Sequence, residues 1–472
     1  MFMLKLWNTS SRTIEEFQPI ASKRIGMYAC GPTVYQRAHI GNFRAYVFED
    51  ILRRVLEREG YGVTHVVNIT DVGHLVGDVD EGVDKVEQAA RSAGKTAWDI
   101  AREFADLFLV DLKRLGIELP TRMPKATDNI PEQIALIQEL ERKGFTYTTS
   151  DGVYFDTSKF PEYGSFSGQP LEEKEEGARV ITNLEKRNST DFALWKFSHP
   201  NGRSFDSAQD DIQTKRQMEW DSPWGVGFPG WHIECSAMSR KELGQPFDIH
   251  AGGVDHISVH HENEIAQSVA AYGAPLARYW FHVEFLLVDG QKMSKSLGNT
   301  YTLEDLEKKG FDPLSYRYFL LGAHYRQKQN FTWEALSAAK QALTKLRHAV
   351  RGWDEPKTGC ADLEAEFFSA LHADLNTPQA LAVLWKTVDS EVPTSAKAET
   401  VRMMDHILGL GLSGIIAKPI PVPDAIRSLL DARASAREQK NWSESDQLRD
   451  EMVSLGWNVE DTSDGQRPHP AD

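Results

Sequence analysis

Two cysteines and a histidine–glutamate pair are the residues of this chain best suited to metal chemistry. Cys30 and Cys235 lie far apart in the sequence, and His260 and Glu264 are four residues apart, so on a helix they would project from one face. Thiolate, imidazole and carboxylate are ligands that Zn²⁺ accepts in four-coordinate sites. We therefore hypothesise that the fold gathers these four residues around a metal.

Residue chemistry alone leaves alternatives open. A cysteine that is not a ligand is usually a small buried apolar residue, and these two do not form a compact Cys-x-x-Cys pair. His261 can replace His260 as a ligand, and Glu262 can replace Glu264. The third cysteine, Cys360, stands in no motif, and its default interpretation is a buried or surface thiol.

Two further motifs suit the binding of phosphates. His39-Ile40-Gly41-Asn42 lies where a strand is expected to give way to a helix, and the helix N-terminus, His39 and Asn42 would offer donors to phosphate oxygens. In residues 289–299, Lys292 and Lys295 stand among serines and glycines, typical of a cationic loop that closes over a triphosphate. The plain alternatives are a capping or surface histidine and an exposed basic turn.

The elements that must position these motifs follow an α/β pattern. A strand is predicted over residues 24–35, a helix over 42–59 and a second strand over 63–69, with helices filling 83–115. This order forms a βαβ unit, which predicts a parallel sheet with ligands at the carboxyl ends of its strands.

The middle of the chain interrupts this pattern, and its last third is helical. A helix over 131–143 and a hairpin over 145–156 precede a polar stretch, 198–217, predicted to be a surface loop or partly disordered. The α/β pattern resumes near Gly230, so about 80 residues are inserted between two halves of one nucleotide-binding fold. Beyond this, helices are predicted at 333–350, 361–372, 377–388 and 396–410, and a Pro-rich break, 418–423, precedes a final helical pair and a short strand near 457–460.

Composition limits the class of protein. A chain of 472 residues is expected to hold about two to four domains. The sequence contains no run of 18 apolar residues and no secretory pattern at its start, so we expect a cytoplasmic protein with no membrane contact. The net charge of −16 argues against indiscriminate polyanion binding. Residues 307–357 carry a local excess of positive charge, which on charge alone is best interpreted as solvated helix faces.

Taken together, the histidine motif and the Lys-Met-Ser-Lys-Ser run resemble the two signature motifs of class I aminoacyl-tRNA synthetases. The longer segments CGPTVY, DFALWK, WDSPWG, GWHIECSAM and HHENEIAQS, at residues 30–35, 191–196, 220–225, 230–238 and 260–268, resemble the cysteinyl-tRNA synthetase family. The similarity extends from Leu4 to about Asp464.

The resemblance implies an α/β fold: a split Rossmann-type parallel sheet with an inserted subdomain, followed by a mainly α-helical tRNA-binding region. The implied domains are the first half of the catalytic domain (1–140), an inserted connective subdomain (141–228), the second catalytic half (229–305), a stem-contact region (306–350), an anticodon-binding type of helical bundle (351–418) and a small C-terminal domain (424–472).

The resemblance also implies roles for individual residues. One Zn²⁺ per chain would bind the substrate thiolate through Cys30, Cys235, His260 and Glu264, and would reject serine without an editing domain. Other implied positions are Gly31, Thr33, Thr70 and Trp231 around the amino acid, Asp255 on its ammonium group, Gly252 and Gly253 near adenosine, and His39, Asn42, Lys292 and Lys295 on the phosphates.

The implied activity is ATP-dependent activation of L-cysteine, with Mg²⁺ accompanying ATP, followed by transfer to cysteine tRNA by a monomeric enzyme. The basic stretch 307–357 then becomes a predicted tRNA-facing segment. Two alternatives are a cysteine ligase with an amino-sugar acceptor, as in mycothiol biosynthesis, and a tRNA-binding paralogue without catalysis. The chain departs from the family pattern at residues 255–259, in the length of 198–217 and at the C-terminal segment 465–472.

Overall fold

A computed structural model describes residues 3–73, 75, 84–168, 184–198, 216–294, 297–418, 421–462 and 465–470. Lys295 and most of the predicted loop 198–217 therefore lie outside the described residues. The chain forms two compact units: residues 1–340 with 365–383 and 407–410, and residues 341–364 with 384–406 and 411–472.

A parallel four-stranded sheet organises the first unit, with strand order β10-β9-β3-β4. Its strands are β3 (Arg24–Ala29), β4 (Gly62–Val67), β9 (Phe247–Gly253) and β10 (Ala277–Val283). Helix α1 (Ile40–Arg58) packs on β4, β9 and β10, and α6 (Trp231–Leu243) packs on β3 and β4. The predicted βαβ unit is confirmed, and β3 and β9 become neighbours although an inserted segment separates them in the sequence.

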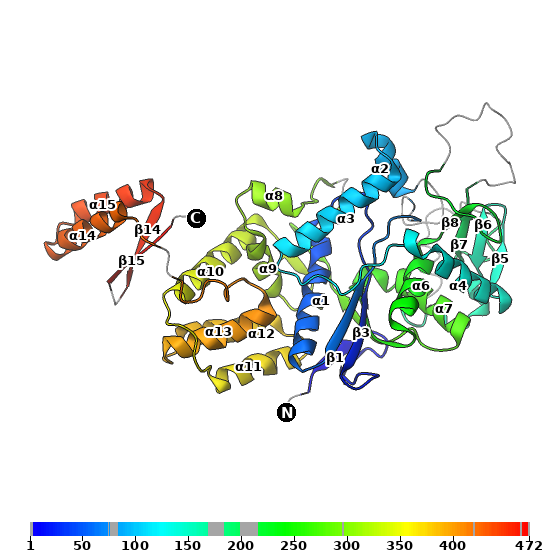
Figure 1. The fold of residues 1–472 in the computed structure, drawn as a ribbon, viewed down its shortest axis with the longest axis horizontal. Helices are drawn as coiled ribbons and strands as arrows, with labels where there is room; N and C mark the ends of the chain where they lie inside the picture. The colour runs from blue at the N-terminus through cyan, green and yellow to red at the C-terminus, as the bar shows by residue number, and fades with distance from the viewer. Residues whose placement is uncertain are drawn as a thin grey trace. The chain divides into compact units, whose positions relative to one another are not determined.

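The inserted segment forms its own antiparallel sheet, β5-β6-β7-β8, of β5 (Thr146–Thr148), β6 (Gly152–Phe155), β7 (Phe192–Phe197) and β8 (Gly227–Pro229). The predicted hairpin corresponds to β5 and β6. This sheet shares one apolar core with α4 (Ile130–Arg142), α6 and α7 (His260–Tyr272). Figure 1 shows the sheet and these helices together at its right-hand end. Because α6 and α7 also carry the predicted ligands, the insert supports the helices that position them.

The other elements of the first unit surround this frame. The chain begins with the hairpin β1 (Lys5–Asn8) and β2 (Thr13–Glu16), and β11 (Leu286–Val288) lies between β12 (Gln291–Lys292) and β13 (Gln329–Phe331). Helices α2 (Lys85–Ala93), α3 (Ala97–Arg114), α8 (Leu303–Lys308) and α9 (Pro313–Leu321) complete it, with short 3₁₀ turns η1 (Thr127–Asn129), η2 (Thr157–Lys159) and η4 (Val254–His256).

Helices dominate the rest of the chain, as predicted. They are α10 (Trp333–Arg351), α11 (Ala361–His372), α12 (Thr377–Asp389), α13 (Thr394–Leu408), α14 (Asp424–Glu438) and α15 (Trp442–Ser454). A hairpin of β14 (Trp457–Thr462) and β15 (Gly465–Pro470) follows. Ile426, Met452 and Val459 form a small core of their own within 421–462, which ties α14, α15 and β14 together.

Candidate active site

A cavity of about 350 Å³ opens at the carboxyl ends of the parallel strands, where α/β sheets normally bind ligands. Most of the residues predicted to act on substrates line it. Those lining residues are Cys30, Gly31, Thr33, His39, Asn42, Thr70, Trp231, Cys235, Gly252, Gly253, Asp255, His260 and Lys292. The fold thus brings together motifs from both halves of the split sheet.

Three of the predicted metal ligands, Cys30, Cys235 and His260, line one end of the cavity, and Glu264 lies beside them. Ligand atoms of Cys30, Cys235, His260 and Glu264 all lie within 4.8 Å of one another, and all four side chains are buried. His260 Nε2 lies 3.0 Å from Glu264 Oε1, as expected for residues four apart on α7. The helix therefore delivers an imidazole and a carboxylate to two cysteines that come from separate elements.

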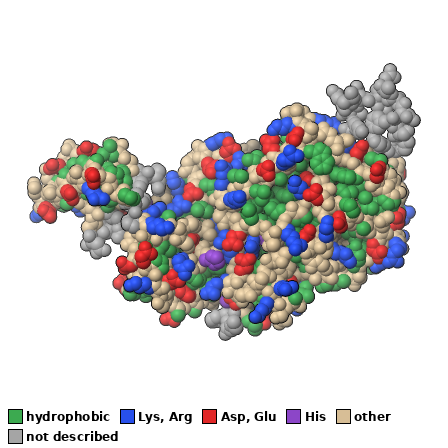
Figure 2. Space-filling view, viewed as in Figure 1, with side chains coloured by type: hydrophobic (Ala, Val, Ile, Leu, Met, Phe, Trp, Pro, Cys, Tyr) green, Lys and Arg blue, Asp and Glu red, His purple; other side chains and the backbone are tan. Residues whose placement is uncertain are grey.

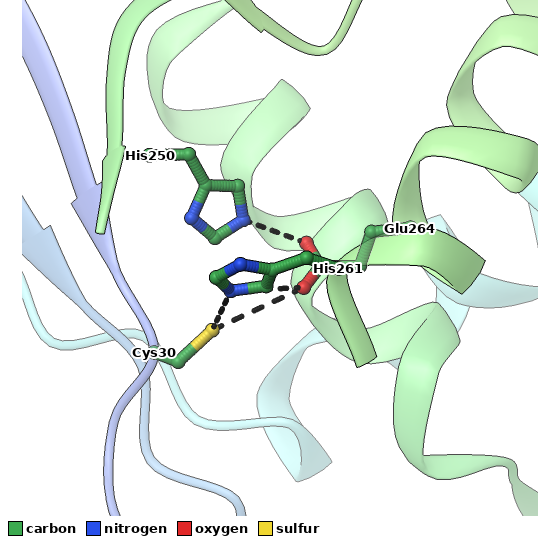
Figure 3. Close-up of side chains that lie close together, drawn as sticks. All are labelled: Cys30, His250, His261 and Glu264. Carbon is green, nitrogen blue, oxygen red and sulfur yellow. Dashed lines mark hydrogen bonds and ion pairs between the residues drawn. The ribbon is translucent and has the colours of Figure 1, made fainter. Parts of the chain in front are cut away.

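The same region offers a second donor set, which the sequence interpretation did not foresee in full. Cys30, His250, His261 and Glu264 also have ligand atoms within 4.8 Å of one another (Figure 3). His261 Nε2 is 3.2 Å from the Cys30 sulfur, and His250 Nε2 is 2.8 Å from Glu264 Oε2. In contrast, Glu262 accepts hydrogen bonds from the backbone N–H groups of Gly164 and Ser167.

Burial and charge determine the protonation of the cluster. Burial alone would lower the pKa of His260, but Glu264 and Cys235 outweigh it and raise that pKa to about 10. For Glu264, the nearby His250 and His260 overcome burial and hold the pKa well below its usual range. Burial and the surrounding histidines both lower the pKa of His261, so its imidazole is neutral.

The two cysteines differ in pKa although their sulfur atoms lie within 4.8 Å of each other. Burial, followed by the hydrogen bond with Cys235, raises the pKa of Cys30. Burial also acts to raise the pKa of Cys235, but the hydrogen bond with Cys30 and the attraction of His260 outweigh it and lower that pKa to about 6. The pair therefore holds a thiolate readily at Cys235, the form in which cysteine binds metals.

Neighbouring aromatic and polar groups fix these ligands. The Trp231 ring stacks on His260 at a centroid distance of 4.5 Å, and His232 Nδ1 lies 2.9 Å from His260 Nδ1. The Thr70 hydroxyl donates to Glu234 Oε2 at 2.9 Å. The sequence interpretation missed His232 and Glu234, although both stand within the quoted segment at residues 230–238.

The glycine of the Cys30 segment has a steric role. A Cβ atom on Gly31 would lie 1.5 Å from the backbone oxygen of Asn68, at the end of the neighbouring strand, so only glycine allows this approach. The Gly31 N–H donates to Asn68 Oδ1 at 2.8 Å. Strand ends β3 and β4 are thereby held close together under the cavity.

The other end of the cavity carries the histidine motif. His39 is the N-cap residue of α1, and its backbone N–H donates to Asn42 Oδ1 at 3.0 Å. His39 is half-buried and Asn42 is exposed, so both stand at the cavity wall. The predicted order of strand and then helix is confirmed, but the strand predicted over 24–35 ends at Ala29, so residues 30–39 connect β3 to α1.

The lysine loop meets this motif directly. Lys292 is exposed, and its ammonium nitrogen lies 4.8 Å from the centre of the Phe285 ring. The next residue, Met293, lies so close to Gly41 that a Cβ atom on Gly41 would be 2.0 Å from the Met293 methyl carbon. The loop and the histidine motif are therefore in contact, as the phosphate-binding hypothesis requires of them.

Comparisons with known proteins show which family this chain belongs to. The family model of the class I (C) tRNA synthetase catalytic domain matches residues 16–341, and that of the cysteinyl-tRNA ligase anticodon binding domain matches 421–467. The chain is 52% identical over 465 residues to cysteine–tRNA ligase 1 of Burkholderia lata, covering 98% of this chain and 96% of that protein. The chain belongs to the cysteine–tRNA ligase family. A second family member, from Treponema denticola, is 41% identical over 495 residues, covering 97% and 98% of the two chains.

Solved structures support the fold. Mycobacterium tuberculosis methionyl-tRNA synthetase in complex with methionyl-adenylate matches with a TM-score of 0.55 at 17% identity, over 83% of this chain and 93% of that one. Agrobacterium radiobacter LeuRS, solved in a ternary complex, matches with a TM-score of 0.57 at 13% identity, over 87% and 88%. The predicted class I architecture is confirmed. Within the described part of the chain, the helices are too short or too polar to cross a membrane.

Proposed function

We propose that the protein is a cysteine–tRNA ligase. It would join the carboxylate of L-cysteine to the α-phosphate of ATP, releasing pyrophosphate, and then transfer the cysteinyl group to the 3′ adenosine of cysteine tRNA. Family membership over nearly the whole chain supports the activity. The observation that carries it is the single cavity that joins a buried Cys/His/Glu cluster to both phosphate motifs.

The donor set fits the zinc ion that this activity implies. Two cysteines, one imidazole and one carboxylate, all buried and mutually within 4.8 Å, are the ligand types that Zn²⁺ takes in four-coordinate sites. We propose Cys30, Cys235, His260 and Glu264 as its ligands. When bound there, zinc would supply a thiol-selective binding point at the cavity, because it binds a thiolate far better than a serine hydroxyl.

Residues around this cluster would hold the rest of the amino acid. Asp255 lines the cavity and carries the carboxylate proposed to pair with the substrate ammonium group. Thr33 and Thr70 also line it, and so do Gly31 and Trp231. Because Trp231 stacks on His260, we propose that it closes the side of the pocket around the substrate thiol.

The nucleotide would occupy the opposite end. His39, Asn42, Lys292 and Lys295 are proposed to neutralise charge that develops on the leaving pyrophosphate, an effect strongest in a site that excludes water. Gly252 and Gly253, at the end of β9, are proposed to lie against the adenosine. Mg²⁺ would accompany ATP as a counter-ion to its phosphates.

The helical part of the chain would hold the tRNA. We propose that residues 306–350 contact the tRNA stem, that residues 351–418 form a helical bundle of the anticodon-binding type, and that residues 424–472 form a small C-terminal domain. On the face drawn in Figure 2, Lys and Arg side chains are interspersed with Asp and Glu, so contacts with tRNA phosphates would depend on local groups such as those in 307–357. A cytoplasmic monomer is the proposed working form.

Two alternatives are less well supported. A ligase that joins cysteine to an amino sugar has no use for an anticodon-binding domain, and residues 421–467 match that domain. A paralogue without catalysis has no use for a cavity that keeps both phosphate motifs beside the buried cluster.

Charging of tRNA is the decisive experiment. Purified protein should catalyse cysteine-dependent exchange of pyrophosphate into ATP. It should also attach cysteine, but not serine, to cysteine tRNA. If the protein exchanges pyrophosphate but does not charge tRNA, and consumes an amino sugar instead, it is the alternative ligase with an amino-sugar acceptor. Absence of exchange would end the activation proposal altogether.

A further inference from the structure

The buried cluster contains more metal-binding side chains than one site needs. The two donor sets share Cys30 and Glu264 and differ in their other pair. One pair is Cys235 and His260, which the proposed zinc site uses. The other pair, His250 and His261, has no role in the proposed reaction, although both side chains are fully buried among the ligands.

The two pairs face different surroundings. Cys235 and His260 line the cavity, whereas His250, His261 and Glu264 lie behind its wall. Glu264 can serve both sides, because its Oε1 lies 3.0 Å from His260 Nε2 while its Oε2 lies 2.8 Å from His250 Nε2. Figure 3 shows the second set, with Cys30 at the end of β3, His250 on β9 and the other two on α7.

The ring of His261 is held in a ligating orientation. Its Nδ1 lies 2.8 Å from His282 Nε2, and His282 Nδ1 lies 2.8 Å from the Thr9 hydroxyl. These contacts engage the rear nitrogen of His261 and leave Nε2 directed at Cys30, at 3.2 Å. A hydrogen bond to the ring nitrogen that does not bind the metal is how proteins usually orient a metal-binding histidine.

We propose that the cluster provides two coordination positions for one divalent metal ion: a cavity position formed by Cys30, Cys235, His260 and Glu264, and a sealed position formed by Cys30, His250, His261 and Glu264. The inference rests on the proposed zinc function and adds a site to it. A metal in the cavity position can meet a substrate thiol. A metal in the sealed position would reach the cavity only through Cys30, because His250, His261 and Glu264 do not line it.

The two positions differ in ligand chemistry, which makes them distinguishable. The cavity position supplies two thiolates and one imidazole, and the sealed position supplies one thiolate and two imidazoles. Softer metal ions favour the thiolate-rich set, and imidazoles suit zinc, cobalt and nickel as well. Removal of Cys235 should therefore move the metal to the sealed position rather than release it.

The test uses the full-length protein loaded with Co²⁺, whose thiolate charge-transfer absorption reports the number of sulfur ligands. Cys235→Ala should still bind about one Co²⁺ per chain, with lower affinity than the wild type and about half of the charge-transfer intensity, because one of two thiolates is lost. The double variant Cys235→Ala/His261→Gln should bind Co²⁺ with an affinity at least tenfold lower again. His261→Gln alone should retain metal at the cavity position.

A matched control separates ligation from damage to the core. His65 is another buried histidine, on β4 and outside both donor sets, so Cys235→Ala/His65→Gln should bind Co²⁺ as well as Cys235→Ala does. If a double variant fails to fold, X-ray absorption on Cys235→Ala alone decides, since two imidazoles are expected where the cavity position would give one.

Two results would overturn the sealed position. One is a folded Cys235→Ala that binds no Co²⁺, and the other is retention of a single-imidazole site in that variant. A wild-type protein that binds neither zinc nor Co²⁺ would instead refute the metal part of the proposed function. The failure of the inference and the failure of that function are therefore separate outcomes.

Discussion

The two ends of the cavity are built in opposite ways. At the cysteine end, Cys235 is 1% exposed and Glu264 is 0% exposed, and the buried His232 and His250 contact His260 and Glu264. At the nucleotide end, Asn42 and Lys292 are exposed, and the main contact between the two motifs is Met293 lying on Gly41. One end is thus assembled before any substrate arrives, and the other presents charge to solvent.

The difference matches what each end has to recognise. A cysteine differs from a serine by one atom, so discrimination requires ligands held in fixed geometry and shielded from water. A triphosphate is large and highly charged, so exposed donors can bind it and then tighten as water is excluded. We therefore expect substitutions at the cysteine end to change specificity and metal content, and those at the nucleotide end to change only the ATP step.

Loss of Cys30 should have the largest effect, because both donor sets contain it. Cys30→Ala should lower cysteine-dependent pyrophosphate exchange about a thousandfold, equivalent to roughly 4 kcal/mol of lost stabilisation. Zinc content should fall with it. The control is Cys360→Ala, which removes the remaining half-buried cysteine and should change neither quantity. Full zinc content in Cys30→Ala would contradict the proposed site.

Lys292→Ala tests the nucleotide end. The exchange rate should fall roughly a hundredfold, because this removes a cation that we propose stabilises the leaving pyrophosphate. Zinc content and cysteine KM should stay unchanged if the two ends act separately. Lys328→Ala, at an exposed lysine outside the cavity lining, is the matched control. A loss of zinc in Lys292→Ala would show that the two ends of the cavity do not act separately.

His232→Gln tests the support behind the ligands. His232 contacts His260 Nδ1, so its loss should weaken zinc binding by roughly 10-fold to 100-fold while sparing ATP binding at saturating metal. Competition with a chelator measures the change, and added zinc should restore most of the exchange activity. Unchanged zinc affinity would show that the His232 contact does not orient the ligand.

Gly41→Ala should have the smallest effect. The new methyl group would collide with Met293, displacing the lysine loop at a cost of about 1 kcal/mol, which is roughly a fivefold rise in the KM for ATP. Because Met293 is flexible, the double variant Gly41→Ala/Met293→Ala should recover most of the wild-type value. No recovery would indicate that the His39 ring, 3.1 Å from the same added Cβ, is the group disturbed.

Local patterns predicted much of this molecule. The spacing of apolar residues predicted α1 and β4 within two residues at each end, and it predicted the start of β3 but placed its end six residues too late. The hairpin of β5 and β6 followed from the Asp151-Gly152 turn. The later helices α10 to α12 also began where periodicity placed them. These features depend on residues close in sequence, whose own propensities and spacing specify them.

Local sequence patterns did not predict the second donor set, which includes His250 and His261. His250 lies in a buried strand and His282 in another, and a histidine in an apolar run carries no local signal of ligation. The choice between His260 and His261 was likewise open until the family resemblance was considered, since both stand at the start of one helix. Their neighbours come from the end of β3 and from β9, β10, α6 and η4, so only folding determines which nitrogen meets which sulfur.

The sequence by itself determined the chemistry available to this protein: three cysteines, two phosphate motifs, a split α/β pattern and a helical C-terminal part. Tertiary structure decided how that chemistry is distributed. Pairing of β3 with β9 brings Cys30 and His250 to one edge of the sheet, and the insert core supports α6 and α7 so that Cys235 and Glu264 reach the same point. Long-range packing sets these distances to within a few ångströms, and metal coordination depends on that precision in a way that residue type alone cannot supply.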